Sequence, residues 1–215
     1  MLFKDNEKIL FTGDSVTDAG RARPVGMNAG LGNAYVAVVN NMLNAFYPEL
    51  RLPVYNTGVS GNTSRDLAAR FDSDVLALEP DTAVICIGFN DVWRQYDYPA
   101  YKETHVYIDE YERNLEEMVG KALKAGIRVI LMTPYYIEPN REDWMRKSMD
   151  RYGAAVKKIA ERHGLMCIDL QKPFDEFLKY RYSASVVWDR VHPNNIGSML
   201  IAREFLKAVG FDRFN

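Results

Sequence analysis

The sequence has few cysteines, no long hydrophobic run and no excess of charge of one sign. Its 215 residues include only two cysteines, Cys86 and Cys167, each inside an apolar run. A disulfide framework is therefore excluded, and both thiols are expected to behave as small hydrophobic side chains in strands. No apolar stretch approaches the roughly 20 residues that a membrane helix requires. The first residues, MLFKDNEKILF, lack the apolar segment of a secretion signal, so we expect a cytoplasmic protein without a membrane partner.

The charged residues are nearly balanced, with 27 basic against 29 acidic and a formal net charge of −2. No basic run gathers on one segment, which argues against a nucleic-acid partner. The strict glycine patterns of phosphate loops and of dinucleotide binding are absent after the first apolar run. No His/Cys cluster is spaced to hold a metal. We therefore predict neither a cofactor nor a metal.

Short apolar runs alternate with longer segments of helical character along the whole chain. The candidate strands span residues 8–13, 53–58, 82–88, 128–133 and 165–170, and the candidate helices span 32–50, 62–80, 106–126, 143–164 and 195–210. Near-continuous runs of Val, Ile and Leu are typical of parallel strands that are covered on both faces. The sequence therefore predicts one α/β domain over residues 1–215. Its expected architecture is a doubly wound, flavodoxin-like, five-stranded parallel sheet flanked by helices.

Small and polar residues follow the first four candidate strands. They are Gly13-Asp14-Ser15, then NTGVSGNT at 56–63, then Gly88-Phe89-Asn90-Asp91, then residues 133–136. In open parallel sheets, ligands bind beyond the carboxyl ends of the strands. This edge of the sheet is therefore the predicted site.

Only three histidines are available as a general base for a nucleophile at this edge. His163 falls at the end of a predicted helix, where an imidazole commonly favours the helix dipole. His105 lies in a long aromatic segment, residues 93–107, which is expected to be a loop and has no nucleophile near His105 in sequence. His192 follows Asp189 by three residues, so in a turn the carboxylate could reach Nδ1 and leave Nε2 free as a base.

Each of these residues also has a simpler structural interpretation. Asp189 could start a turn before a helix that Asn194 or Asn195 caps. Ser15 or Asp14 could cap a helix, or this loop could form a phosphate-binding nest. Gly61 and Asn90 could be ordinary turn or cap residues. None of these features decides the function alone.

Four blocks in order resemble the SGNH, or GDSL-type, hydrolases: Gly13-Asp14-Ser15, Gly61 in NTGVSGNT, Gly88–Asp91 and Asp189–Pro193. The resemblance spans nearly the whole chain and implies the SGNH hydrolase fold, with the first strand between the second and third. The first block reads GDSVTD in place of GDSL, which leaves the serine in position.

The same resemblance implies roles for the site residues. Ser15 would be the nucleophile, His192 the general base and then acid, and Asp189 the residue that orients the imidazole. The oxyanion hole would be formed by the backbone N–H groups of Ser15 and Gly61 and by the side-chain amide of Asn90.

Longer stretches are similar to the bacterial acetylxylan esterase branch of this family. They are GRARP, GVSGNTSRDL, NDVWRQYD, DEYERNL, LMTPYYIE and WDRVHP. The resemblance implies a serine esterase that removes acetyl groups from xylan or xylo-oligosaccharides through an acyl-enzyme, and a homo-oligomer. With no secretion signal, the expected substrates are short acetylated oligosaccharides after import.

Aromatic residues near the predicted site could offer faces on which sugars stack, or could instead pack in the core or between subunits. They are Trp93, Tyr96, Tyr98, Tyr135, Tyr136 and Trp188. Arg21 and Arg94 could bind sugar hydroxyls, or could pair with Asp18 and Asp91. The candidate substrate-binding residues are Asp14, Arg21, Trp93, Arg94, Tyr135 and Trp188.

No long apolar segment suggests a lipase lid, so short acyl groups are expected, acetyl first. A broader short-chain esterase, a thioesterase or a lysophospholipase on the same fold remains an alternative. A more remote alternative is a non-catalytic carbohydrate or flavin binder, in which Asp189 and His192 would be idle.

Overall fold

A six-stranded sheet in the order β2-β3-β1-β4-β5-β6 organises the computed structural model, which describes residues 1–213. The strands are β1 (Ile9–Gly13), β2 (Gly26–Met27), β3 (Val54–Asn56), β4 (Thr82–Cys86), β5 (Arg128–Met132) and β6 (Met166–Ile168). All neighbours pair in parallel except the edge strand β2, which is antiparallel to β3. The five predicted parallel strands are confirmed. The strand count was wrong by one, because a two-residue strand is too short to show a hydrophobic pattern.

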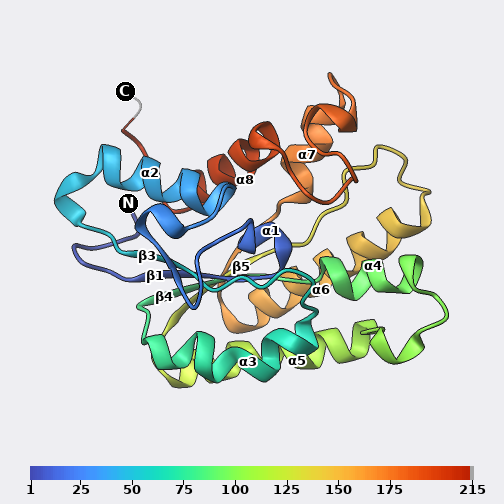
Figure 1. Ribbon diagram of the computed structural model, residues 1–215, viewed down its shortest axis with the longest axis horizontal. Helices are drawn as coiled ribbons and strands as arrows, with labels where there is room; N and C mark the ends of the chain where they lie inside the picture. The colour runs from blue at the N-terminus through green and yellow to red at the C-terminus, as the bar shows by residue number, and fades with distance from the viewer. Residues whose placement is uncertain (214–215) are drawn as a thin grey trace.

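Helices cover both faces of the sheet (Figure 1). They are α1 (Ser15–Asp18), α2 (Tyr35–Phe46), α3 (Ser64–Asp74), α4 (Phe89–Asp97), α5 (Ile108–Lys124), α6 (Trp144–His163), α7 (Gln171–Leu178) and α8 (Asn195–Ala208). Short 3₁₀ helices span Asn28–Gly30, Pro48–Leu50, Leu76–Leu78, Lys102–Thr104 and Ser183–Ser185. In Figure 1, α2 and α8 lie above the sheet and α3 and α5 lie below it. This is the predicted doubly wound arrangement.

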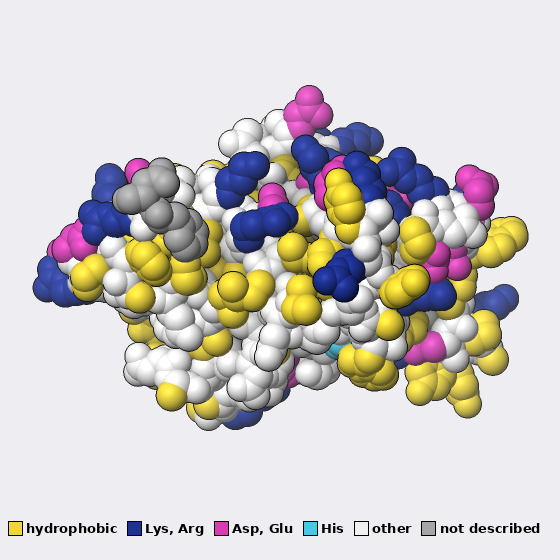
Figure 2. Space-filling model, turned by 90° about the horizontal axis from the view of Figure 1, so that it is seen from above, with side chains coloured by type: hydrophobic (Ala, Val, Ile, Leu, Met, Phe, Trp, Pro, Cys, Tyr) yellow, Lys and Arg dark blue, Asp and Glu magenta, His cyan; other side chains and the backbone are white. Residues whose placement is uncertain are grey.

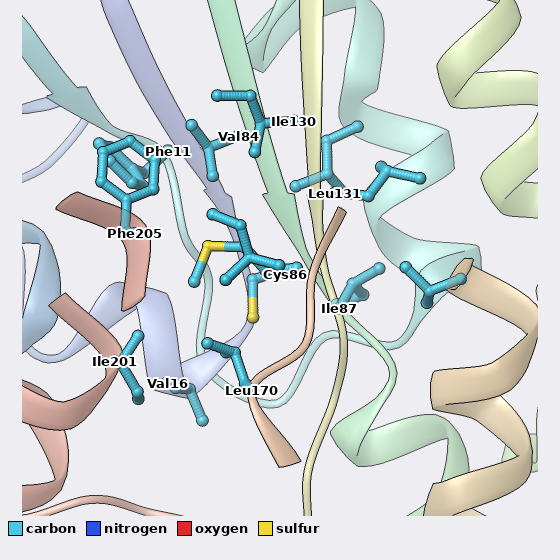
Figure 3. Close-up of a cluster of buried hydrophobic side chains, with 14 of the residues drawn as sticks. Phe11, Val16, Val84, Cys86, Ile87, Ile130, Leu131, Leu170, Ile201 and Phe205 are labelled. Carbon is cyan, nitrogen blue, oxygen red and sulfur yellow. The ribbon is translucent and has the colours of Figure 1, made fainter. Parts of the chain in front are cut away.

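The central strands carry apolar side chains on both faces of the sheet, and these side chains are buried. Every residue of β1 and β4 is buried. Figure 3 shows Phe11 of β1 facing Phe205 of α8, and their ring centroids lie 5.1 Å apart. Cys86 is fully buried in β4 and Cys167 is partly buried in β6, and both are free thiols. Burial raises the pKa of Cys167 to about 11.

Each of the five predicted helical segments contains a helix, but α1, α4 and α7 were not predicted. The aromatic segment around Trp93 was expected to be a loop, whereas its first part forms α4. Phe89, Val92, Trp93 and Tyr96 follow the spacing of one helix face, so the apolar stripe was present in the sequence and was missed.

The strand order brings the predicted site together. Strand β1 lies between β3 and β4, as the family resemblance implied. The chain segments that follow these three strands therefore meet at one edge of the sheet. No helix within residues 1–213 is long and apolar enough to cross a membrane. The single domain over residues 1–215 stays a prediction, because the last two residues lie outside the described part.

Candidate active site

Ser15 is displayed at the end of the central strand, as the first residue of α1. The strand ends at Gly13, where a Cβ atom would lie 2.0 Å from the carbonyl oxygen of Cys86. Only glycine therefore lets β1 end this close to β4. Asp14 then caps α1, because its Oδ1 accepts a hydrogen bond of 3.0 Å from the N–H of Val16. Ser15 itself is half-buried.

Ser15, His192 and Asp189 form a continuous chain of hydrogen bonds. The Ser15 Oγ lies 2.7 Å from Nε2 of His192, and Nδ1 of the same ring lies 2.5 Å from Oδ2 of Asp189. An ionised carboxylate can only accept, so Nδ1 carries the proton and Nε2 accepts the hydrogen of the Ser15 hydroxyl. The arrangement leaves the serine oxygen next to a base.

The loop that carries His192 is fixed by hydrogen bonds to its own residues and to the core. The Asp189 Oδ1 accepts the N–H groups of Val191, at 3.0 Å, and His192, at 2.7 Å. The buried Tyr135 hydroxyl donates to the Val191 carbonyl at 2.9 Å. Asn194 caps α8, as the simpler interpretation predicted. Asp189 therefore starts a turn and also orients the imidazole, so the two interpretations hold together.

Three N–H groups are available beside the serine. Within residues 1–213, the backbone N–H groups of Ser15 and Gly61 have no hydrogen-bond acceptor. Gly61 has a φ of 84°, a conformation that favours glycine. The Asn90 amide gives one hydrogen to the Asn62 carbonyl at 2.9 Å, which fixes the amide and leaves its second hydrogen free. All these groups meet in a hollow of about 530 Å³, the active-site hollow, which is lined by Ser15, Ser60, Gly61, Asn90, Trp93, Arg94, Trp188 and His192.

Arg70 joins the loops that carry the serine and Gly61. Its guanidinium donates to the carbonyls of Gly13, at 2.9 Å, and Thr57, at 2.8 Å. It also donates to the Asn62 side chain at 2.7 Å. Burial is the largest influence on this group and lowers its pKa. The contacts reveal a role that the sequence did not show, because the Gly13 carbonyl, which ties Arg70 to the serine loop, lies 57 residues away along the chain.

Asp91 joins the Gly61 loop to the helix that carries Asn90. Its two carboxylate oxygens accept the N–H of Ser64, at 3.0 and 2.9 Å, and Oδ1 also accepts the Ser64 hydroxyl at 2.5 Å. Burial raises the pKa of Asp91 to about 7, although the hydrogen bonds from Ser64 lower it. Asp18 joins α1 to the Gly61 loop in the same way, since its Oδ2 accepts both the N–H and the hydroxyl of Ser60, each at 2.8 Å.

Three predicted substrate-binding residues are buried away from the hollow, so those predictions were wrong. Asp14 is fully buried. Arg21 is buried because its guanidinium donates to the carbonyls of Gly58, Ala22 and Pro24 rather than pairing with Asp18. Tyr135 is fully buried between Phe89 and Phe174, with ring centroids 4.8 and 4.5 Å away.

Asp14 lies in a strongly desolvating environment directly before the serine. Its Oδ2 has no hydrogen-bond partner within residues 1–213. Burial raises the pKa of Asp14 to about 8, against a smaller opposite effect of the hydrogen bond from Val16. The side chain is therefore mainly neutral at pH 7.

Trp93, Arg94 and Trp188 do line the active-site hollow. The Trp188 ring stacks on the His192 imidazole, with centroids 5.8 Å apart and planes at 13°, yet it is 82% exposed. The centroid of the Trp93 ring lies 5.6 Å from that of the His192 ring, and the two planes make an angle of 46°. Arg94 pairs with Asp97 rather than with Asp91, so the pairing considered from the sequence was wrong.

The other two histidines have structural contacts. His163 is the last residue of α6, and its Nε2 lies 2.6 Å from a carboxylate oxygen of Glu116 in α5. His105 is buried, and its Nε2 lies 3.0 Å from the Tyr98 carbonyl oxygen. Neither histidine lines the active-site hollow. Within residues 1–213, no group of three or more His, Cys, Asp or Glu residues is placed to hold a metal ion.

A serine, a histidine and an aspartate in a hydrogen-bonded chain at the carboxyl edge of a doubly wound sheet define a serine hydrolase. The family model of the GDSL-like lipase/acylhydrolase family matches residues 11–200. The chain belongs to this family.

Two similar proteins align over nearly the full chain. The acetylxylan esterase of Geobacillus stearothermophilus is 52% identical over 214 residues, which cover 99% of this chain and 98% of that protein. Its crystal structure has a TM-score of 0.97 and covers 99% of this chain and 98% of its own. An alpha/beta hydrolase enzyme from the metagenome of Lake Arreo, Spain, is 47% identical, with a TM-score of 0.95 and 98% coverage of both chains.

Three further solved structures are catalytic mutants of the Geobacillus enzyme. In each of them one residue, a serine, a histidine or an aspartate, is replaced by alanine. The aspartate and the histidine stand three positions apart in that enzyme. The same spacing separates Asp189 from His192 in this chain.

Proposed function

We propose that this protein is a serine esterase that removes acetyl groups from acetylated xylo-oligosaccharides through an acyl-enzyme. The observation that carries the proposal is the hydrogen-bonded chain from Ser15 through His192 to Asp189, which opens into a hollow with three free N–H groups. The similarity to an acetylxylan esterase over nearly the whole chain supports the substrate class.

In the first half-reaction the Ser15 oxygen attacks the acetyl carbonyl carbon while Nε2 of His192 takes the hydroxyl proton. The Asp189 carboxylate stabilises the imidazolium that forms. The oxyanion accepts hydrogen bonds from the N–H groups of Ser15 and Gly61 and from the Asn90 amide. One such donor contributes roughly 3 kcal/mol to transition-state stabilisation. His192 then protonates the sugar oxygen as it leaves.

In the second half-reaction a water molecule attacks the acetyl-enzyme. His192 takes a proton from this water as the new bond forms, and the oxyanion uses the same three donors. The tetrahedral intermediate then expels the Ser15 oxygen, which recovers its proton from His192. Acetate leaves and the free enzyme is restored.

The lining of the active-site hollow favours a short acyl group. Ser60, Gly61 and Asn90 present polar atoms next to Ser15, and the apolar surface comes from the rings of Trp93 and Trp188. Each methylene of a longer acyl chain gains about 0.8 kcal/mol only when it is buried. The exposed Trp188 ring cannot bury a chain in this way, so a longer acyl group gains little.

Trp93, Trp188 and Arg94 are the proposed contacts to the acetylated sugar. The indole rings offer faces for stacking, and the Arg94 guanidinium offers donors to hydroxyl groups. A cytoplasmic location, with short imported oligosaccharides as substrates, and a homo-oligomeric state both stay predictions.

The test is acetate release from acetylated xylo-oligosaccharides by the wild type and by Ser15→Ala. The variant is expected to lose turnover and covalent labelling by a fluorophosphonate, because both require the serine oxygen. Ser73→Ala, which changes an exposed serine of α3, is the matched control and should behave as the wild type. Normal labelling of Ser15→Ala would disprove the assignment.

The same assay separates the alternatives. Longer acyl esters and acyl thioesters are compared with the acetylated oligosaccharides at equal enzyme concentration. A higher kcat/KM for long-chain esters, lysophospholipids or thioesters would replace the acetyl-sugar assignment. Binding of oligosaccharide or flavin without any turnover or labelling would instead identify a non-catalytic binder.

A further inference from the structure

A second hollow lies beside the active-site hollow. It measures about 490 Å³ and shares Gly61 and Arg94 with the active-site lining. One wall is the first turn of α3, and the other is the segment from Tyr98 to Thr104 that follows α4. The two hollows are therefore neighbours, and a ligand longer than one sugar ring can enter both. A volume of this size is within the usual range for small-molecule sites.

The segment after α4 presents aromatic rings to solvent at this place. Tyr98 is 50% exposed and Tyr101 is 57% exposed, with ring centroids 6.2 Å apart and an interplanar angle of 70°. Figure 1 shows this segment at the end of the molecule that carries α4. Figure 2 keeps that end at the right and shows hydrophobic side chains projecting there.

Polar groups with unused hydrogen-bonding capacity accompany the rings. Within residues 1–213, the Glu103 carboxylate and the phenol hydroxyls of Tyr98 and Tyr101 have no hydrogen-bond partner. Aromatic faces combined with free carboxylate and hydroxyl groups match a sugar ring, which has apolar C–H faces and hydroxyl groups at its rim. An acyl chain placed here would desolvate the carboxylate without giving it a partner.

The segment is held in this shape by contacts on its inner side. The Arg65 guanidinium donates to the carbonyls of Glu103, at 3.1 Å, and His105, at 3.0 Å, and it forms an ion pair with Glu110. His105 contacts the Tyr98 carbonyl, and the Arg94 guanidinium lies 5.5 Å from the centre of the Tyr98 ring. A segment fixed in this way loses little conformational entropy when it binds a ligand.

We propose that this second hollow, the tyrosine subsite of Tyr98, Tyr101 and Glu103, binds a xylose unit next to the acetylated one. The inference rests on the proposed esterase function and adds a chain-length preference to it. The tyrosine subsite makes an acetylated oligosaccharide a better substrate than a small acetyl ester, because the ester reaches only the active-site hollow.

The test compares kcat/KM for monoacetylated xylotriose with kcat/KM for 4-nitrophenyl acetate. In Tyr101→Ala the ratio of these two values is expected to decrease by about threefold to tenfold, which corresponds to the energy of one aromatic contact. Tyr101→Phe keeps the ring and should retain most of the ratio. Tyr180→Ala, which removes an 84% exposed tyrosine outside both hollows, is the control and should keep the wild-type ratio.

Calorimetric titration with unacetylated xylotriose gives a readout that does not depend on turnover. Binding to the wild type is expected to weaken about threefold to tenfold in Tyr101→Ala. An unchanged ratio and unchanged binding in that variant would overturn the tyrosine subsite, as would a selective loss of activity on 4-nitrophenyl octanoate. No xylotriose binding to the wild type would overturn it as well. The esterase proposal fails separately, through normal fluorophosphonate labelling of Ser15→Ala.

Discussion

Asp14 gives the protein a pH-dependent stability that a single substitution should remove. The carboxyl is fully buried, and one of its oxygens has no hydrogen-bond partner within residues 1–213. Asp14→Asn keeps the shape of the side chain and the oxygen that accepts the N–H of Val16, but it cannot ionise. The variant therefore isolates the cost of placing a carboxylate at this position.

The magnitude follows from the pKa of Asp14, which burial raises from its ordinary value of 3.8 to about 8. Between these values the folded state holds a proton that the unfolded state has lost. The free energy of unfolding must therefore fall as pH rises, by roughly 1.4 kcal/mol per pH unit. The stabilisation is complete below pH 4 and is lost once pH passes about 8. Between pH 5 and pH 9 the loss amounts to about 4 kcal/mol.

Urea unfolding of the wild type and Asp14→Asn at pH 5, 7 and 9 tests this expectation. As pH rises, the free energy of unfolding of the wild type should fall relative to that of Asp14→Asn. Asp91, whose pKa burial raises to about 7, is present in both proteins, so the effect of its own burial is common to both. Its charge also raises the pKa of Asp14, and this interaction is part of the difference that the comparison measures. Asp109→Asn, which changes an exposed aspartate of α5, should keep the wild-type slope. A constant difference between wild type and Asp14→Asn from pH 5 to pH 9 would refute the reasoning.

Three further predictions concern the groups around the serine. Asn90→Ala should lower kcat by roughly a hundredfold with little change in KM, because it removes an oxyanion donor; steady-state kinetics on acetylated xylo-oligosaccharides check this, and a pure rise in KM would contradict it. Tyr135→Phe should lower the free energy of unfolding by about 1–3 kcal/mol in urea titrations, since it leaves the buried Val191 carbonyl unpaired. Unchanged stability would show that this carbonyl finds another donor. Arg70→Lys should lower kcat more than it raises KM, because an ammonium cannot reach all the oxygens that the guanidinium joins. A loss of stability with wild-type kcat would limit Arg70 to a packing role.

The fold could be predicted where buried strands and amphipathic helices leave a pattern. The run from Ile9 to Gly13 is apolar throughout because helices cover both faces of β1. Helix α4 could have been predicted from Phe89, Val92, Trp93 and Tyr96, which stand at helical spacing. It was missed because it has only nine residues and its first turn carries the polar Asn90 and Asp91. Strand β2 has only two residues and pairs at the sheet edge, so its position depends on the tertiary structure alone.

The site could be predicted in part for a related reason. Ser15 directly follows the apolar run of β1, and the three-residue spacing of Asp189 and His192 indicates a carboxylate that orients an imidazole. The loop that carries this pair follows α7 and a 3₁₀ helix rather than a strand, so the strand pattern alone did not place it beside Ser15. Burial of individual side chains could not be predicted in the same way. Arg21 and Tyr135 stand close to strand ends in sequence, but whether each points into the core or toward the hollow depends on partners from distant segments.

The neutral form of Asp14 also bears on the chemistry at Ser15. The proposed oxyanion forms beside the backbone N–H of Ser15, one residue after the Asp14 carboxyl. A carboxylate at that position would repel the negative charge of the tetrahedral intermediate, with little solvent to screen it. The burial that raises the pKa of Asp14 to about 8 keeps this side chain mainly neutral at pH 7. Asp189 supports the imidazolium at the same time, so the negative charge near the serine is placed where the reaction needs it.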